Sequence, residues 1–342
     1  MRFALNSDQA ALREAVRDLL RAECPPAVVR AGWPGSEESD LARVRRVWDQ
    51  LGEMGVLGAA VPEADGGLGL GAVALVGLLE EAGRAALPLP LMETAFVAGP
   101  LLAAAGEAAL VERLAAGELV VGAALDGSGI VPFAQVADAL IAGDARAPGG
   151  ELRLLRPPAF APLESIDGAR GLGRVAADAG LVLDLDAAAL AAAWERGALG
   201  AAAQLLGLGR ALLALAADYV TERRQFGVAI GTFQAVKHQL ADALLALEFA
   251  APAVLRAAWS LDRGAGDAGR DVAVAKALAS DAALQVAATA LQVHGAIAYT
   301  VEYDLHLHAK RVWAGARAWG DADWQRTRVA AALGLLPEEA LR

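Results

Sequence analysis

Residues 221–242 read TERRQFGVAIGTFQAVKHQLAD and place polar and aromatic side chains between two long apolar stretches. Gly227 and Gly231 predict a turn, because glycine interrupts helices and adopts backbone conformations that other residues disfavour. Residues 223–226 end the helix before the turn, and Phe233 lies at the start of the helix after it. The stretch therefore predicts two long helices joined by a tight connection, here called the elbow.

The polar side chains of the elbow indicate a ligand of particular chemistry. Arg223 can donate to a phosphate, Gln225 can hydrogen-bond, and Phe226 can contact a planar ring. That combination suits an anionic ligand with planar rings, such as a dinucleotide. A capped turn in which Arg223 and Arg224 are merely solvated explains the same residues, and the stretch by itself leaves both interpretations open.

The pattern on either side of the elbow divides the chain into three regions. From residue 187 onward, Ala and Leu recur at helical spacing, with one break at 262–267. Residues 118–186 instead contain short apolar runs bounded by Gly, Asp and Pro, which is typical of strands. We therefore predict a mainly α protein with an N-terminal helical domain at 1–117, a small β domain at 118–186 and a helical bundle at 187–342.

Composition and charge exclude several classes of protein. Thirty basic and 41 acidic residues give a net charge of -11, which repels phosphate backbones, so no nucleic-acid partner is expected. Cys24 is the one cysteine, and residues 1–11 lack the layout of a secretory signal, so we expect a cytoplasmic protein. The apolar stretch 197–220 contains Arg210 and Asp218, which favours a buried bundle helix over a membrane span.

A second polar segment, residues 292–311, reads QVHGAIAYTVEYDLHLHAKR. Gly295 permits close backbone approach to a ligand, and Gln292 can hydrogen-bond to a ligand or to a neighbouring chain. A glycine that ends a helix explains the same pattern equally well. His306 and His308 are two residues apart and point to different faces of a helix, so no metal site is predicted.

Four stretches follow one another along most of the chain: WDQLGEMGVLGAAVPEADGGLGL at 48–70, EEAGRAALPLP at 80–90, RRQFGVAIGTFQAVKHQLAD at 223–242 and QVHGAIAYTVEYDLHLHAKR at 292–311. In this order they resemble the acyl-CoA dehydrogenase family. The resemblance implies an N-terminal helical domain, a middle β domain that is reduced here, and a C-terminal four-helix bundle. Short members of the family pair with a fuller homologue in heteromeric complexes of steroid side-chain degradation.

The resemblance also implies FAD, placed between the β domain and the bundle, with its adenosine end contacting a second subunit. The elbow residues implied to bind the pyrophosphate or adenine of a partner's FAD are Arg223, Gln225, Phe226, Phe233 and Gln234. The residues implied to line the cofactor from the second segment are Gln292, Val293, His294, Gly295 and Ala296. Ser128 is the remnant of a Gly-Ser-Asp stretch that holds the flavin in relatives.

The family reaction needs a carboxylate base that removes the α proton of an acyl-CoA thioester while the β hydrogen leaves as hydride to the flavin. Where relatives carry Glu-Gly-Thr, residues 319–321 here read Trp-Gly-Asp, so Asp321 is one candidate base. Glu195, near the start of the first bundle helix, is the other. A helix cap at Asp321 and a favourable helix-dipole position for Glu195 explain these residues without catalysis.

Two functions are consistent with these observations. One is an active FAD-dependent acyl-CoA dehydrogenase of fatty acid or steroid degradation that passes electrons to an electron-transferring flavoprotein. The other is a non-catalytic, cofactor-completing subunit whose homologous partner supplies the base. The resemblance implies a homodimer, a homotetramer or a heterotetramer with a homologous subunit. A flavin-independent acyl-CoA binder is a third class, disfavoured because it has no need of the elbow.

Overall fold

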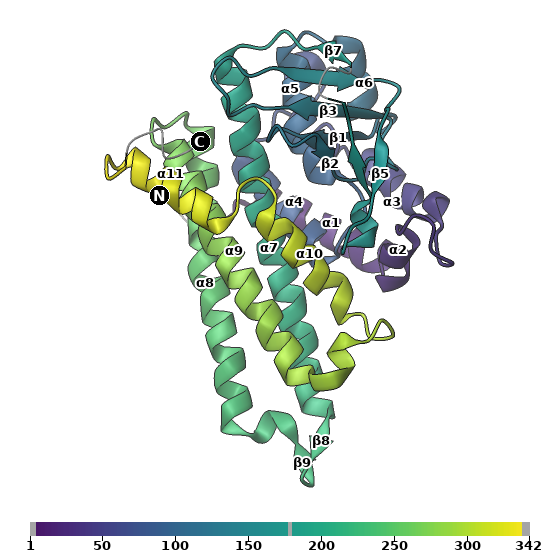
Figure 1. The fold of residues 1–342 in the computed structure, drawn as a ribbon, viewed down its shortest axis with the longest axis vertical. Helices are drawn as coiled ribbons and strands as arrows, with labels where there is room; N and C mark the ends of the chain where they lie inside the picture. Colours follow the sequence, from purple (N-terminus) through teal and green to yellow (C-terminus); the bar gives the residue numbers. More distant parts are fainter. Residues whose placement is uncertain (1–4, 177–179, 337–342) are drawn as a thin grey trace.

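The computed structural model describes residues 5–176 and 180–336, and its elements follow one another in three groups (Figure 1). Helices form the first group, short strands the second, and long helices packed side by side the third. The strands lie at one end of the long helices, and the elbow, which contains β8 and β9, lies at the other (Figure 1). The predicted mainly α fold with a small β region and a helical bundle is confirmed.

The first group is held together by apolar helix faces whose ends are capped by polar side chains. Its elements are α1 (Ser7–Glu23), α2 (Pro26–Ala31), α3 (Leu41–Glu53), η1 (Glu63–Asp65), α4 (Ala72–Arg84), the π-helical η2 (Met92–Ala98), α5 (Gly99–Ala104) and α6 (Ala108–Ala115). Asn6 accepts a hydrogen bond from the Gln9 backbone at the start of α1, and Asp40 caps α3. Trp48 of α3 is fully buried, and its indole Nε1 donates to the Gly117 carbonyl at 3.1 Å.

The second group forms two small sheets. Its strands are β1 (Val121–Ala124), β2 (Ile130–Val131), β3 (Ala139–Gly143), β4 (Leu152–Leu155), β5 (Ala161–Leu163), β6 (Leu172–Arg174) and β7 (Leu181–Val182). One sheet has the order β1-β3-β4-β7, with β1 and β3 parallel, and the other has the order β2-β6-β5, entirely antiparallel. Thr94 of η2 joins the sheet to the helices, because its hydroxyl donates to the Val121 carbonyl at 2.8 Å and accepts from the Val121 amide at 3.0 Å.

The third group is the helical bundle. Its elements are α7 (Ala187–Glu222), β8 (Arg224–Gln225), β9 (Val228–Ala229), η4 (Ile230–Thr232), α8 (Gln234–Asp262), α9 (Ala268–His294), η5 (Gly295–Tyr299), α10 (Leu305–Arg317) and α11 (Ala322–Ala332). Helices α7 to α10 form the predicted four-helix bundle (Figure 1). Two apolar segments, Ala187–Glu222 and Ala268–Tyr299, are long and apolar enough to cross a membrane, but 67% and 61% of their respective 18-residue apolar windows are buried inside the protein. That burial is typical of core helices, as predicted for residues 197–220.

Glycines allow the backbones of α4 and α7 to contact each other directly. A Cβ at Gly207 of α7 would lie 1.8 Å from the Glu80 carbonyl oxygen, and a Cβ at Gly83 of α4 would lie 2.1 Å from the Gln204 carbonyl oxygen. Real Cβ atoms do not approach backbone oxygen so closely, so both positions require glycine for this crossing. The contact joins the N-terminal helices to the bundle.

We expect Gly207→Ala to destabilise the protein by about 1–3 kcal/mol or more, because the added methyl group forces the two helices apart. In an open helix position the same change is favourable by up to about 1 kcal/mol. Gly315→Ala in α10 is the matched control, since its Cβ would meet its nearest neighbour at 3.4 Å, an ordinary contact. Chemical denaturation of the three proteins measures the difference, and equal midpoints for Gly207→Ala and Gly315→Ala would contradict the proposed crossing.

Candidate functional site

A cavity of about 270 Å³ lies between the β region and the bundle. Its walls come from β1 and the loop after it, the region of η3 (Gly168–Arg170), α7 and the end of α10. The polar and aromatic residues that line it are Asp126, Ser128, Arg170, Trp194, Arg317 and Trp319. Ser128 thus lies at the junction where the resemblance places a flavin, but its hydroxyl already donates to Asp126 at 2.6 Å and accepts from the Ile130 amide at 3.1 Å.

Trp319, which stands where relatives carry the glutamate of Glu-Gly-Thr, lines one side of this cavity. Its backbone has a φ of 59°, a conformation that is uncommon for a bulky residue, and its side chain is buried. Its ring lies 5.4 Å from that of Trp194, which in turn lies 5.6 Å from that of Trp324. Gly197 makes room for the indole, because a Cβ there would lie 2.2 Å from the Trp319 ring. Indole rings cannot abstract a proton, so this wall is apolar and inert.

The elbow connects two long helices, as predicted, but its local structure differs from the prediction. Residues 223–226 do not end the first helix, because α7 ends at Glu222 and Arg224–Gln225 form a strand. Strands β8 and β9 form a hairpin whose two turn residues, Phe226 and Gly227, both have positive φ, as a tight two-residue turn requires. Phe226 is 92% exposed, and its ring meets that of Phe233 edge-on at 6.3 Å. The five elbow residues predicted to contact a cofactor are all exposed: Arg223, Gln225, Phe226, Phe233 and Gln234. Within the described residues, the guanidinium groups of Arg223 and Arg224 have no hydrogen-bond or ion-pair partner.

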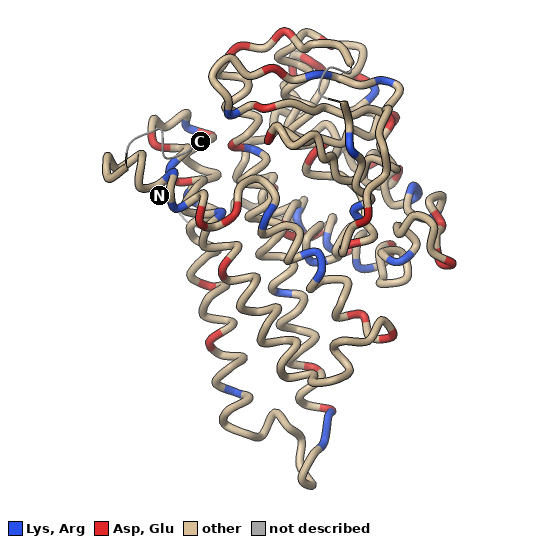
Figure 2. The backbone as a smooth tube through the Cα atoms, in the orientation of Figure 1, with Lys and Arg blue, Asp and Glu red and all other residues tan. Residues whose placement is uncertain are grey.

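The cavity and the elbow lie at opposite ends of the bundle. Trp194 is near the start of α7 and Arg223 directly follows its end, which separates them by about 43 Å at roughly 1.5 Å per residue. Figure 2 shows the basic segment of the elbow at the tip of the molecule, remote from the β region. A single FAD molecule is too short to contact both places in one copy of the chain.

Family models match the two helical parts that flank the β region. Residues 6–118 match "Acyl-CoA dehydrogenase, N-terminal domain", and residues 186–334 match "Acyl-CoA dehydrogenase, C-terminal domain". The chain belongs to the acyl-CoA dehydrogenase family. The resemblance drawn from the four sequence stretches is therefore confirmed.

Relatives of similar length extend over nearly the whole chain. The acyl-CoA dehydrogenase IpdE2 of Mycolicibacterium smegmatis is 32% identical over 96% of this chain and 99% of its own. IpdE2 of Mycobacterium tuberculosis is 32% identical over 90% of this chain and 91% of its own. A chain of the ChsE4-ChsE5 complex from Mycobacterium tuberculosis superposes with a TM-score of 0.86 and 25% identity, covering 98% of this chain and 100% of that chain. A chain of the Tcur3481-Tcur3483 steroid ACAD gives the same TM-score with 28% identity, covering 98% of this chain and 99% of that chain.

Glu195, the first candidate base, faces away from the cavity. Glu195 is not among the residues that line the cavity, because adjacent helical residues are rotated by about 100° and its side chain points toward α11 while Trp194 lines the cavity. There its carboxylate forms an ion pair with Arg328 of α11. Burial raises the pKa of the Glu195 carboxyl, and the charge of Arg328 acts in the opposite direction. This pairing gives Glu195 a structural partner, and its catalytic role stays a prediction.

Asp321, the second candidate, caps a helix. Its carboxylate accepts the Trp324 backbone amide at 2.9 Å at the start of α11. The loop before it is held by Lys276 of α9, whose ammonium group donates to the carbonyls of Ala316 and Gly320, both at 3.1 Å. Lys276 is fully buried, and this burial lowers its pKa to about 7. Lys276 therefore fixes the loop that carries Trp319, a role that the sequence did not reveal.

Some residues of the second polar segment, 292–311, are exposed and others are buried. Gln292, Gly295 and Ala296 are exposed, whereas the side chains of Val293 and His294 are buried. His294 stacks on Tyr219 with ring centroids 4.2 Å apart, its Nδ1 contacts the Ala290 carbonyl at 2.7 Å, and its Nε2 contacts the Tyr303 hydroxyl at 3.1 Å. Burial lowers the pKa of His294. Because Tyr219 belongs to the last turns of α7, this stacking brings the second segment to the elbow end of the bundle.

A buried charged cluster that was not predicted from the sequence lies behind Trp319. Glu93 of η2 is the one carboxylic acid that lines a small cavity of about 20 Å³, which Trp319 separates from the larger one. Its Oε2 has no hydrogen-bond partner among the described residues, and burial raises the pKa of its carboxyl. Arg311 lines the same cavity, pairs with buried Asp167 and donates to the Leu87 carbonyl at 2.8 Å. The available signal was a lone acid within the apolar run at 86–105.

The depressed pKa of Lys276 predicts that its contribution to stability increases as the pH rises. Between about pH 7 and pH 10 the unfolded chain holds a proton on Lys276 that the folded chain releases, so Lys276 raises the free energy of unfolding across this window, whereas the raised pKa of Cys24 acts in the opposite direction above about pH 9. We expect Lys276→Met to flatten this rise, and Lys237→Met, a change at an exposed lysine of α8, to leave it unchanged. Denaturant titrations at several pH values measure the slope, and an identical slope in Lys276→Met and the parent would contradict the assignment.

Proposed function

We propose that this chain is the cofactor-completing subunit of an FAD-dependent acyl-CoA dehydrogenase complex in the cytoplasm. Its elbow binds the pyrophosphate and adenosine part of an FAD whose flavin is held by a homologous partner, and the partner provides the carboxylate base. The bound FAD supplies the acceptor for the β hydride of the acyl-CoA, and an electron-transferring flavoprotein then takes the electrons. The residues of this chain contribute binding and orientation.

The observation that carries the proposal is the contrast between the two ends of α7. At the elbow, Arg223 and Arg224 are exposed and without partners in the described chain, although guanidinium groups and an amide such as Gln225 are the donors that a pyrophosphate requires. A Cβ at Gly227 would meet nothing within 4 Å, so the backbone leaves room for a ligand. These features fit the dinucleotide part of FAD.

The other end fits a flavin and a substrate poorly. An isoalloxazine and an acyl thioester would have to share about 270 Å³, whereas sites for one small ligand measure about 300–1,000 Å³. Trp319 and Trp194 fill the wall where a base would act, and the acid that lines the cavity, Asp126, is bonded to Ser128. The base is therefore assigned to the partner.

A homologous subunit is the partner that the surface supports. Helices α8 and α9 expose large apolar side chains that a lone copy leaves in water: Leu244, Leu245, Phe249, Leu278 and Leu284. Phe249 is 75% exposed, which is unusual for a phenylalanine in the middle of a helix. Structures that resemble this chain include the ChsE4-ChsE5 complex and the Tcur3481-Tcur3483 steroid ACAD, whose names each contain two different proteins.

We expect the purified chain alone to lack the visible absorbance of flavin and to gain it in complex with a homologous subunit expressed alongside it. In that complex, Arg223→Gln should weaken FAD retention about 10- to 100-fold, because a charge-assisted hydrogen bond contributes about 1.5–3 kcal/mol. Arg46→Gln on α3, also an exposed arginine without a described partner, is the control and should have no effect. Equilibrium dialysis with absorbance readout measures the retention, and stoichiometric FAD on the chain alone would contradict the proposal.

A second candidate function is an acyl-CoA dehydrogenase that is active by itself. It is favoured by the unpaired Oε2 of Glu93 and by the buried Nε1 of Trp194, which has no partner among the described residues and lines the 270 Å³ cavity. Unpartnered buried polar atoms commonly mark a site that a ligand or water completes.

Substitution of each candidate acid distinguishes between the two proposed functions. If the partner supplies the base, Glu93→Gln, Glu195→Gln and Asp321→Asn each lower the rate of acyl-CoA oxidation by the complex less than about threefold. Loss of a base in this chain would instead cost about 10²- to 10⁴-fold. The assay follows reduction of an artificial electron acceptor, and circular dichroism checks that each variant folds.

A further inference from the structure

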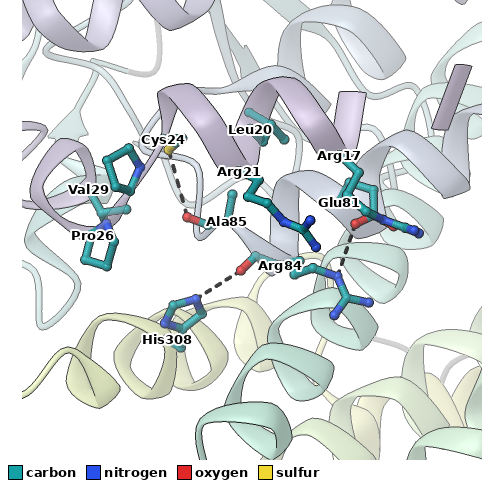
Figure 3. A pocket seen from close by; sticks show the side chains of 11 residues that line it. Arg17, Leu20, Arg21, Cys24, Pro26, Val29, Glu81, Arg84, Ala85 and His308 are labelled. Atoms are coloured by element: carbon teal, nitrogen blue, oxygen red, sulfur yellow. Dashed lines mark hydrogen bonds and ion pairs between the residues drawn. The ribbon is translucent and has the colours of Figure 1, made fainter. Parts of the chain in front are cut away.

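We propose that the chain contains a second binding site, for a small amphipathic anion, between α1, α2, α4 and α10. A pocket of about 290 Å³ that is open to solvent on one side is lined there by residues of these four helices and the short α1–α2 link (Figure 3). It shares no lining residue with the cavity beside Trp319 and lies away from the elbow. The inference does not depend on the proposed function of the elbow.

One end of this cavity is basic. Arg17 and Arg21 of α1 and Arg84 of α4 line it together with one acid, Glu81 (Figure 3). These four lining residues carry a net charge of +2, although Glu14 and Glu80 also lie close enough to act on Arg17 and the whole chain carries -11. A local excess of positive charge on an acidic protein attracts anions to this place.

The guanidinium groups at this end are incompletely used. Glu81 is buried and accepts from Arg17 Nη2 at 2.9 Å, from Arg84 Nε at 3.1 Å and from Arg13 Nε at 2.7 Å. These ion pairs lower the pKa of Glu81 even though its burial acts in the opposite direction. The Nε of Arg17 is buried without a partner, and Arg21 has none among the described residues. The guanidinium of Arg21 therefore retains the two parallel N–H donors that suit a carboxylate or phosphate.

The other end of the cavity is apolar. Its lining residues are Leu20, Cys24, Pro25, Pro26, Val29 and Ala85. Figure 3 shows Cys24, Pro26 and Val29 on the side opposite to Arg17, Glu81 and Arg84. His308 of α10 closes the cavity, with its Nε2 at 3.0 Å from the Arg84 carbonyl. Burial lowers the pKa of His308, so the imidazole is neutral near pH 7 and adds no charge to the apolar end.

This division defines the ligand class. A carboxylate or a phosphate monoester would bind at the arginines, and an aliphatic chain or single ring attached to it would fill the apolar end. The volume lies at the lower limit of sites for small organic molecules, about 300–1,000 Å³, which favours a ligand with a short tail over a large conjugate.

The single cysteine provides the measurement. Cys24 lines the apolar end and is 5% exposed, and burial raises its pKa to about 12. Its alkylation by the neutral reagent N-ethylmaleimide is therefore slow, and because Cys24 is the single cysteine, the reaction reports on this cavity alone. We expect saturating octanoate or octyl phosphate to slow the alkylation of the full-length chain at least tenfold, as followed by mass spectrometry. Octanol and inorganic phosphate at the same concentrations should leave the rate unchanged.

The matched variants test the role of the arginines. Arg21→Gln should raise the concentration of octanoate or octyl phosphate needed for half-protection about tenfold, because one charge-assisted interaction is lost. Arg46→Gln, an exposed arginine on α3, should not change it. Since Arg21 is exposed and has no described partner, the variant should retain its fold, which thermal unfolding checks.

Three results would overturn the proposal. The first is that neither octanoate nor octyl phosphate protects Cys24 from alkylation. The second is that octanol or inorganic phosphate protects Cys24 as well as octanoate or octyl phosphate does. The third is that Arg21→Gln is protected at the same ligand concentrations as the parent. None of these results depends on FAD, so failure of this site is distinguishable from failure of the elbow assignment.

Discussion

The close crossing of α4 and α7 is the constraint on which the rest of the structure depends. Gly83 and Gly207 place each helix against the other's backbone carbonyls, and no larger side chain fits at either position. This contact fixes the middle of α7 against the N-terminal helices, and the helix extends from there to both of its ends. Because α7 is continuous over Ala187–Glu222, the crossing determines where both the cavity and the elbow lie.

The two ends of α7 differ in a way that separates binding from proton transfer. At the cavity end, three indoles pack together and both candidate bases are engaged, Glu195 with Arg328 and Asp321 with the start of α11. At the elbow end, arginine and glutamine side chains extend from a tight hairpin without partners in the described chain. Exposed hydrogen-bond donors at the tip of a bundle are available to bind a ligand or another subunit, which is consistent with a shared cofactor site.

Buried charge distinguishes the interior of this chain from an ordinary apolar core. Glu81, Glu93 and Lys276 are each almost completely removed from water, and charged groups at such positions need partners. Glu81 has three arginines, and Lys276 has two backbone carbonyls and the Ser280 hydroxyl. Glu93 retains an unpaired oxygen within the described structure. The cluster at Glu81 produces the basic end of the second cavity, because its arginines exceed the single acid that they surround.

The sequence by itself determined the order of the regions, the break at 262–267, a turn at Gly227 and the membership of the acyl-CoA dehydrogenase family. These are local properties, since periodicity and turn residues act over a few positions along the chain. Only the tertiary structure decided that Glu195 pairs with Arg328, that Lys276 holds the loop of Trp319, and that Arg17, Cys24 and His308 enclose one cavity. Such contacts join residues far apart in sequence, and a rotation of about 100° per helical residue decides which side chain faces a cavity.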